Sequence, residues 1–149
     1  MAIPAYDPLG LLPAGVYDCT LAEAATVLCW NDHRRRLWDD LLRFIEHEYR
    51  PLKVKAPLWI DGSFVRRKEL PPDVDVVLDF SGENDGLPKC MQLRLKHATI
   101  KREYRVDLWP RHPLLPHDLA EFFQYAGDKC AVELNIPPKT PKGILRVVP

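Results

Sequence analysis

The amino-acid sequence predicts an α+β fold, and three observations support this prediction. Residues 32–49 carry apolar side chains at three- and four-residue spacing, which is typical of an amphipathic helix. Residues 58–60 and 73–80 are short, largely apolar runs bounded by Pro, Gly, Ser or Asp, as strands are. With 149 residues, the chain has the length of a single domain, residues 1–149, that buries a substantial core.

The N-terminal part begins with residues 1–19, which are rich in Pro and Gly. We expect them to form an extended arm without regular structure. Thr20 and Glu23 then fit a capping box, in which each side chain bonds the backbone amide of the other residue. A short helix is therefore expected from this point to about Leu28.

The long helix is expected to begin after Asn31, a favourable N-cap, and to end before Pro51. The arginines at 34–36 lie in its first turns, where the helix dipole disfavours cations. We interpret these arginines as a solvated face, with a phosphate or partner contact as the alternative.

The middle of the chain continues with a turn and two further elements. The composition of residues 81–88 predicts the turn, and residues 87–97 predict a helix with Pro88 in its first turn, where a missing amide costs little. Residues 99–109 alternate between apolar and polar side chains well enough to predict a third strand.

The C-terminal part is expected to contain little regular structure. Residues 117–125 predict a short helix, with Gly127 as its stop. Residues 127–149 then form a loop-rich C-terminal segment, with a terminal edge strand at residues 143–148.

Charge and composition limit the function classes. The 21 basic and 21 acidic side chains balance to zero, which argues against a tight nucleic-acid binder because such proteins usually carry a basic footprint. No apolar run approaches the ~20 residues of a membrane span, and no secretory leader is recognisable, so we expect a cytoplasmic protein without a membrane partner. The four cysteines lie far apart, which favours reduced thiols over disulfides or a zinc site.

Two carboxylates open the strand at residues 73–80. Side chains alternate faces along a strand, so Asp73 and Asp75 point the same way with Cα atoms about 6.5–7 Å apart. Carboxylates at that separation are able to share divalent ions ~3.5–4 Å apart, the spacing of two-metal phosphoryl chemistry. Asp107 lies between apolar residues in the next predicted strand, where burying a charge is costly unless it is paired or binds a metal. Asp107 is therefore the candidate third ligand.

A glycine–serine turn precedes these carboxylates. Gly62 has no Cβ and lets the backbone come close to a phosphate oxygen, and the Ser63 hydroxyl adds a contact. Arg66, Arg67 and Lys68 follow at once and would neutralise triphosphate charge. These five residues are the candidate nucleotide-binding group.

Other charges near this stretch have plainer interpretations. We interpret Asp61 and Asp79 as turn or edge residues. A basic group further along the chain either lines a path for the acceptor or forms a solvated face, and both alternatives stay open. The members of this group are Arg94, Lys96, Lys101, Arg102 and Arg105.

These motifs resemble the nucleotidyltransferase superfamily of DNA polymerase beta. The superfamily pattern is Gly-Ser, a short connection, Asp-x-Asp and a distant Asp on a later strand. The matching positions, within a core motif at residues 57–109, are Gly62, Ser63, Asp73, Asp75 and Asp107. The match is most similar to bacterial minimal nucleotidyltransferases, many of which occur in toxin–antitoxin or phage-defence loci.

The resemblance implies a small mixed β-sheet with helices packed mainly on one face, and a two-metal mechanism. Asp73 and Asp75 would hold two Mg²⁺ or Mn²⁺ ions, while Asp107 would bind the acceptor-side ion and act as general base. The resemblance also implies an NTP substrate, ATP or CTP, and a hydroxyl acceptor on a protein or an RNA. A small-molecule acceptor is the weaker alternative, because such enzymes usually carry a second helical domain.

Two departures separate this chain from the superfamily pattern. Pro72 stands where a Ser usually precedes the first carboxylate, and residues 65–67 are Val-Arg-Arg where Ala-Arg-Gly is common. With the small size and neutral charge, they motivate an alternative function from another class. In that alternative the chain is a catalytically silent subunit that binds and regulates a partner protein, such as a cognate toxin or defence protein.

Overall fold

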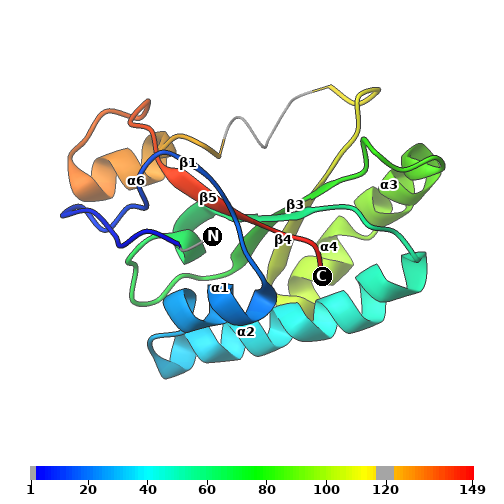
Figure 1. Cartoon of the computed structure of the whole chain (residues 1–149), viewed down its shortest axis with the longest axis horizontal. Helices are drawn as coiled ribbons and strands as arrows, with labels where there is room; N and C mark the ends of the chain where they lie inside the picture. Colours follow the sequence, from blue (N-terminus) through cyan, green and yellow to red (C-terminus); the bar gives the residue numbers. More distant parts are fainter. Residues whose placement is uncertain (1–2, 117–122) are drawn as a thin grey trace.

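The computed structural model describes residues 3–116 and 123–149, and within them an α+β architecture is built on a five-stranded mixed sheet. The strand order is β1-β5-β2-β3-β4 (Figure 1). The strands are β1 (Gly15–Asp18), β2 (Leu58–Asp61), β3 (Val74–Asp79), β4 (Val106–Arg111) and β5 (Gly143–Val147). β1 runs parallel to β5 and β3 runs parallel to β4, whereas β2 is antiparallel to both of its neighbours.

The two strands expected around the Gly-Ser turn are confirmed, whereas two expectations about the chain ends are wrong. β5 is an interior strand between β1 and β2, so the C-terminal segment does not end in an edge strand. Residues 1–19 contain regular structure, because β1 forms at residues 15–18. This strand pairs with the edge of β5, where Gly15 lies opposite Gly143, and no local sequence pattern predicts that pairing.

The first helix, α1 (Leu21–Leu28), begins as expected. The Thr20 hydroxyl accepts from the Glu23 amide at 3.1 Å, and the Glu23 carboxylate accepts from the Thr20 amide at 2.7 Å. The capping box therefore satisfies two amides that the helix cannot bond itself. This prediction is confirmed.

The second helix, α2 (Asp32–Phe44), is also confirmed with its cap. The Asn31 side chain accepts from the Arg34 amide at 2.8 Å. The helix widens into a π-helical turn at Ile45–Tyr49 and closes in a 3-10 turn at Arg50–Leu52. The α-helical and π-helical turns thus end at Tyr49, before Pro51 as expected, and Pro51 lies in the closing 3-10 turn.

The segment before the third strand was assigned wrongly. After α3 (Gly86–Leu95), residues 97–104 form a further helix, α4 (His97–Tyr104), and only β4 is a strand. Ile100 and Tyr104, two apolar members of that alternating pattern, are buried, but they lie four residues apart and share one face of a helix. A spacing of four fits the period of a strand as well as that of a helix, so the apolar pattern did not decide between them.

The C-terminal part contains a helix that was not expected. Gly127, interpreted as a helix stop, begins α6 (Gly127–Leu134), so the segment 127–149 holds a helix and a strand besides its loop at 135–142. Most of the helix expected at residues 117–125 lies outside the described residues. At its end, Tyr125 forms an isolated bridge with Pro141.

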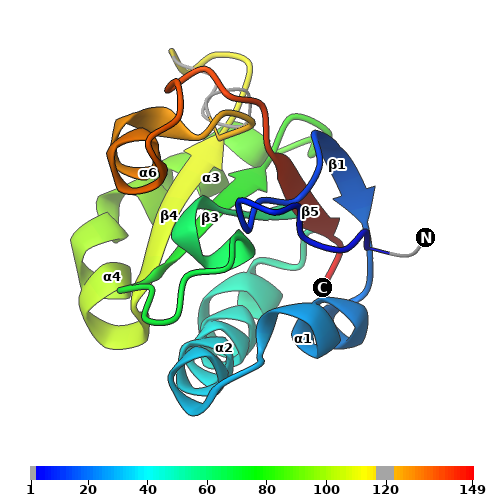
Figure 2. The same ribbon diagram turned by 90° about the vertical axis from the view of Figure 1, so that its left-hand side faces the viewer.

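The elements form layers about the sheet. α1 and α2 lie on one side of the sheet, with α4 beside α2, and α6 lies on the opposite side (Figures 1 and 2). The main hydrophobic core fills the space between the sheet and these first helices, and a smaller cluster with Trp59, Val77 and Ile144 lies on the other face. In the described ranges no helix is long and apolar enough to span a bilayer, and all four cysteines are free thiols, as expected.

Candidate functional site

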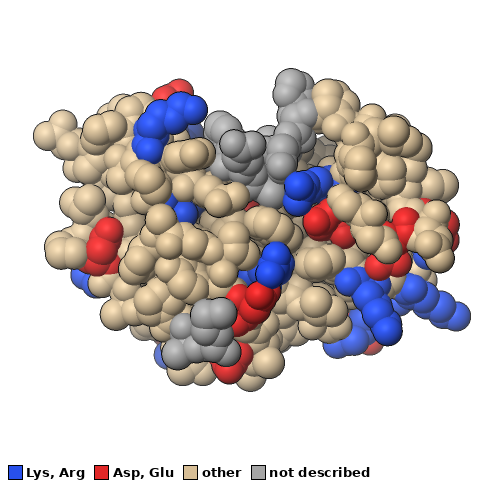
Figure 3. All heavy atoms as spheres, turned by 45° about the horizontal axis from the view of Figure 1, so that its top comes forward, with Lys and Arg blue, Asp and Glu red and all other residues tan. Residues whose placement is uncertain are grey.

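A cavity of about 440 Å³ opens at one end of the sheet. The Gly62-Ser63 turn, the start of β3, β4 and α4 contribute one part of its lining, and α6 with the preceding residues contributes another. Most of the ionisable groups expected at the site line this cavity. Over the face shown in Figure 3, basic and acidic side chains are interspersed, so that face carries no extended basic surface.

The three candidate metal ligands meet at this cavity. Asp75 on β3 lies directly opposite Asp107 on β4 in the parallel pairing, and Asp73 precedes β3. All three aspartates line the cavity. Lys101 of α4 lies 3.7 Å from a carboxylate oxygen of Asp73 and 3.7 Å from one of Asp107. Lys101 is thus the member of the basic group that the described lining of the cavity includes.

Burial and mutual repulsion govern the electrostatics of these carboxylates. Burial raises the pKa of Asp75 to about 7, and the charges of Asp73 and Asp107, with a hydrogen bond that the protonated Asp75 carboxyl donates to Asp107, add to the rise. Burial also raises the pKa of Asp73 against the opposing charge of Lys101, and Asp107 adds to that rise. The nearby cations therefore do not fully offset the burial and mutual repulsion of these carboxylates.

The donor chemistry of this cluster fits a hard divalent cation. In the described part of the chain, no three His, Cys, Asp or Glu side chains are grouped closely enough to hold a metal ion by themselves. Mg²⁺, however, is usually bound by one or two carboxylates together with water and substrate phosphates rather than by a complete protein cage. One buried oxygen of Asp107, Oδ1, has no hydrogen bond among the described residues, although His97 Nε2 lies 3.3 Å from it, so its lone pairs can serve a metal.

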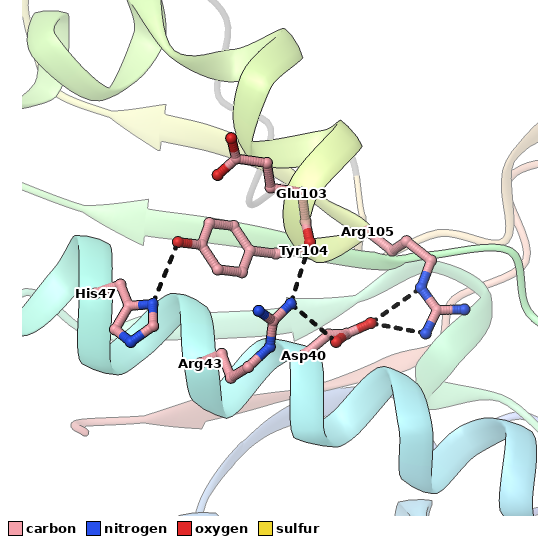
Figure 4. A network of polar contacts seen from close by, with 6 residues as sticks. All are labelled: Asp40, Arg43, His47, Glu103, Tyr104 and Arg105. Atoms are coloured by element: carbon pink, nitrogen blue, oxygen red, sulfur yellow. Dashed lines mark hydrogen bonds and ion pairs between the residues drawn. The ribbon is translucent and has the colours of Figure 1, made fainter.

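Hydrogen bonds and an ion pair of Arg105 hold the start of β4, the strand that carries Asp107. Arg105 joins α4 to β4 in a left-handed conformation (φ 53°), and its carbonyl accepts from the Val74 amide at 3.0 Å. Its guanidinium donates to Asp40 of α2 at 3.0 and 2.7 Å, and Arg43 links Asp40 to α4 (Figure 4). This forked pair ties the start of β4 to α2, so Arg105 serves the fold rather than the cavity.

Gly62 is required at its position for two reasons. Its φ of +70° lies in the left-handed region, and a Cβ built on it would stand 1.8 Å from Asp75 Oδ2. The turn therefore packs directly against the central carboxylate. Ser63 follows in the short 3-10 helix Gly62–Val65 and lines the cavity, as expected.

Asp61 and Lys142 are two buried ionisable residues at the cavity, and Lys142 belongs to its lining. Asp61 is fully buried at the end of an interior strand, so its interpretation as a turn or edge residue is wrong. Both of its carboxylate oxygens are without a hydrogen bond among the described residues. Burial raises the pKa of Asp61 against the stabilising charge of Lys142, whose ammonium lies 3.5 Å from the Gly62 carbonyl. Asp79 does serve a turn: its Oδ1 accepts from the Ser81 amide at 3.0 Å, and its Oδ2 pairs with Arg111.

The basic residues after the turn separate into two groups. Arg66 and Lys68 line the cavity and both contact Glu133 of α6. Arg67 is absent from the lining within the described chain: its amide donates to the Gly10 carbonyl at 2.7 Å and its guanidinium lies over Tyr6. The structure therefore places Arg67 against the N-terminal arm.

Arg34 corrects the interpretation of the helix α2 arginines as a solvated face. It is fully buried, and its guanidinium donates to the carbonyls of Leu28, Phe64 and Lys68. Two of these carbonyls belong to the loop that follows the Gly-Ser turn, so Arg34 holds the loop that carries Arg66 and Lys68. Arg35 remains an exposed residue that pairs with Asp32.

Several of these residues were missed from sequence because no local pattern marks them. Lys142, Glu133 and Arg34 come from segments far from the core motif. His97 is a further residue of this kind: its Nδ1 lies 2.9 Å from the Leu108 carbonyl and its Nε2 lies 3.3 Å from Asp107 Oδ1. Only the position of His97 one helix before the Asp107 strand hinted at this proximity.

Comparison with known proteins identifies a family. A family model described as a family of unknown function, DUF6932, matches residues 4–148, almost the whole chain. No curated protein and no solved structure matches the sequence. The geometry of the cavity is therefore the basis for any functional assignment.

Proposed function

This chain belongs to the DUF6932 family, whose function is unknown, and from its cavity we propose that it is a metal-dependent nucleotidyltransferase. One observation carries the proposal: carboxylates from two adjacent strands meet the Gly62-Ser63 turn at a single cavity. Two-metal phosphoryl transfer needs acidic side chains that bind metals and basic side chains that bind phosphates, and this cavity has both.

In the proposed reaction a hydroxyl oxygen of the acceptor attacks the α-phosphorus of an NTP. The bond from that phosphorus to the bridging oxygen breaks, and pyrophosphate leaves. The proton of the hydroxyl passes to the Asp107 carboxylate, whose Oδ1 has no hydrogen-bond partner in the described residues. When bound by Asp73, Asp75 and Asp107, Mg²⁺ or Mn²⁺ would polarise the acceptor hydroxyl and neutralise charge on the phosphates.

The phosphates are held by the other half of the site. The Gly62-Ser63 backbone and the Ser63 hydroxyl would donate to phosphate oxygens, and Arg66 and Lys68 supply positive charge in the same cavity. The nucleotide is ATP or CTP, and the acceptor is a hydroxyl of a protein or an RNA. We place the protein in the cytoplasm, where a toxin–antitoxin or phage-defence system would use it.

Transfer of a radioactive label tests the proposal. The purified chain is incubated with [α-³²P]ATP or [α-³²P]CTP, Mg²⁺ and cell extract, and labelled acceptors are separated on a gel. Asp75→Asn should lower labelling by about 10³-fold or more, because it removes a ligand on which charge neutralisation depends. Its thermal unfolding temperature should not fall, because the change also removes a repelling buried charge.

Asp79→Asn is the matched control on the same strand. Asp79 pairs with Arg111 and does not belong to the carboxylate cluster, so labelling should stay near the wild-type level. If the wild type and Asp75→Asn label acceptors equally, or if neither transfers label from any NTP, the enzymatic proposal fails.

A second function has one observation in its favour. Three cations of the cavity already have anionic partners within the chain: Glu133 pairs with Arg66 and Lys68, and Lys101 lies between Asp73 and Asp107. A silent subunit that regulates a partner protein, such as a cognate toxin, would keep such a closed site. In that case a complex with the neighbouring gene's product would survive Asp73→Ala with Asp75→Ala, and the labelling assay would stay negative.

A further inference from the structure

The carboxylate of Glu133 bridges the two cationic residues after the Gly-Ser turn. Its Oε1 accepts from Lys68 Nζ at 3.0 Å, and its Oε2 accepts from Arg66 Nη2. Each oxygen thus has one cation, and all three side chains line the cavity. A phosphoryl group offers two oxygens in the same way, so the carboxylate occupies the position that a phosphate would take.

Arg66 makes this a built site rather than a surface contact. Its side chain is 8% exposed, whereas that of Glu133 is 42% exposed. A guanidinium so far removed from water needs an anion beside it, because desolvating an unpaired cation is costly. The hydrogen bond from Arg66, and then that from Lys68, lower the pKa of Glu133, so this partner stays anionic.

Among the described residues, few other side-chain contacts hold the helix that carries Glu133. α6 buries only two small side chains, Cys130 and Ala131, and Val132 beside them is 83% exposed. Both ends of the helix have left-handed residues, Gly127 (φ +77°) and Asn135 (φ 53°). Little apolar area therefore opposes displacement of α6, and the two ion pairs of Glu133 contribute much of what holds it.

We propose that Arg66 and Lys68 bind the terminal phosphate of a polyphosphate chain, and that Glu133 occupies this subsite as a built-in competitor until the ligand displaces it. The subsite and its competitor rest on the proposed function, which supplies a triphosphate as the natural ligand. Arg67 takes no part, because it faces the N-terminal arm. Access of the nucleotide to the cavity is then coupled to movement of α6.

The competitor has a predictable effect on affinity. When a ligand must displace an internal group, its apparent affinity equals its affinity for the free site multiplied by the fraction of molecules in which the site is free. Because Glu133 is part-exposed, its ion pairs are screened by water, and we expect its removal to tighten polyanion binding about fivefold.

Isothermal titration calorimetry with inorganic tripolyphosphate measures this effect on the full chain. Glu133→Gln keeps the shape of the side chain and removes its charge, so it should bind tripolyphosphate about fivefold more tightly than the wild type. Glu133→Asp keeps the charge but is one methylene too short to bridge both cations. Its affinity for tripolyphosphate should lie between those of the wild type and Glu133→Gln. Adding Lys68→Met to Glu133→Gln should abolish the gain.

Glu103→Gln is the control for the loss of one negative charge. Glu103 is an exposed residue of α4 whose carboxylate points away from the Asp40–Arg105 contact (Figure 4), so this variant should bind as the wild type does. Equal affinities of wild type and Glu133→Gln, or no binding by either, would overturn the inference. Thermal melts verify that each variant is folded.

The two proposals fail in distinguishable ways. Tighter tripolyphosphate binding by Glu133→Gln, with no transfer of label by any variant, would keep the anion subsite and remove the enzyme. Label transfer that depends on Asp75, with equal tripolyphosphate affinities in wild type and Glu133→Gln, would keep the enzyme and remove the competitor.

Discussion

The cavity has two walls that are held in place by different forces. On the sheet side, Asp75 and Asp107 stand opposite each other in the β3–β4 pairing, and backbone hydrogen bonds fix their register. On the other side, α6 rests on two small buried side chains and on the ion pairs of Glu133. The residues proposed for chemistry lie on the first wall, and the residue proposed to control access lies on the second.

This division agrees with the demands of the proposed reaction. Two-metal chemistry needs carboxylates held within a fraction of an ångström, which paired strands provide. A substrate as large as a nucleotide must also enter, and segments with little buried area open most easily. If the sheet side of the cavity is fixed and α6 is movable, substitutions in the sheet wall should lower the stability of the protein far more than substitutions in α6.

The largest effect is expected from the buried charges beneath the sheet wall. Lys142→Met leaves Asp61 without its cation in a fully buried place, which should lower the free energy of unfolding by about 3 kcal/mol. Adding Asp61→Asn to Lys142→Met should restore most of that loss, because neither charge then remains. Urea denaturation measures the cycle, and additive losses in the double variant would show that the two groups are not coupled.

An intermediate effect is expected at the Gly-Ser turn. Gly62→Ala places a Cβ at a positive φ and against the Asp75 carboxylate, so unfolding should require about 2 kcal/mol less free energy. Combining it with Asp75→Ala removes the nearest carboxylate atoms and should recover part of the loss. A Gly62→Ala protein as stable as the wild type would contradict the close packing of turn and carboxylate.

The smallest effect is expected on α6. Val132→Ser changes a side chain that is 83% exposed, so the free energy of unfolding should change by less than about 0.5 kcal/mol. Backbone amides of α6 should also exchange with deuterium well before those of β3. Equal protection of the two elements would remove the distinction between a fixed wall and a movable one.

Local chemistry made part of this fold predictable. A capping box, an N-cap and a long amphipathic pattern fix α1 and α2 from residues within a few positions of each other, and both helices were expected. The Gly-Ser turn and the alternating carboxylates were found for the same reason, because a strand period of two places Asp73 and Asp75 on one side. Where a spacing of four suited both a helix and a strand, as in α4, the pattern failed.

The sequence by itself determined the starts of α1 and α2, the two central strands and the carboxylates that line the cavity, because each depends on neighbours along the chain. Only the tertiary structure decided that β5 lies inside the sheet, that Arg34 is buried, and that Glu133 faces Arg66 and Lys68. Those contacts join segments 30 or more residues apart, as from Phe64 to Arg34 or Lys68 to Glu133. Their free energy arises when the whole chain packs, so no stretch of sequence carries it alone.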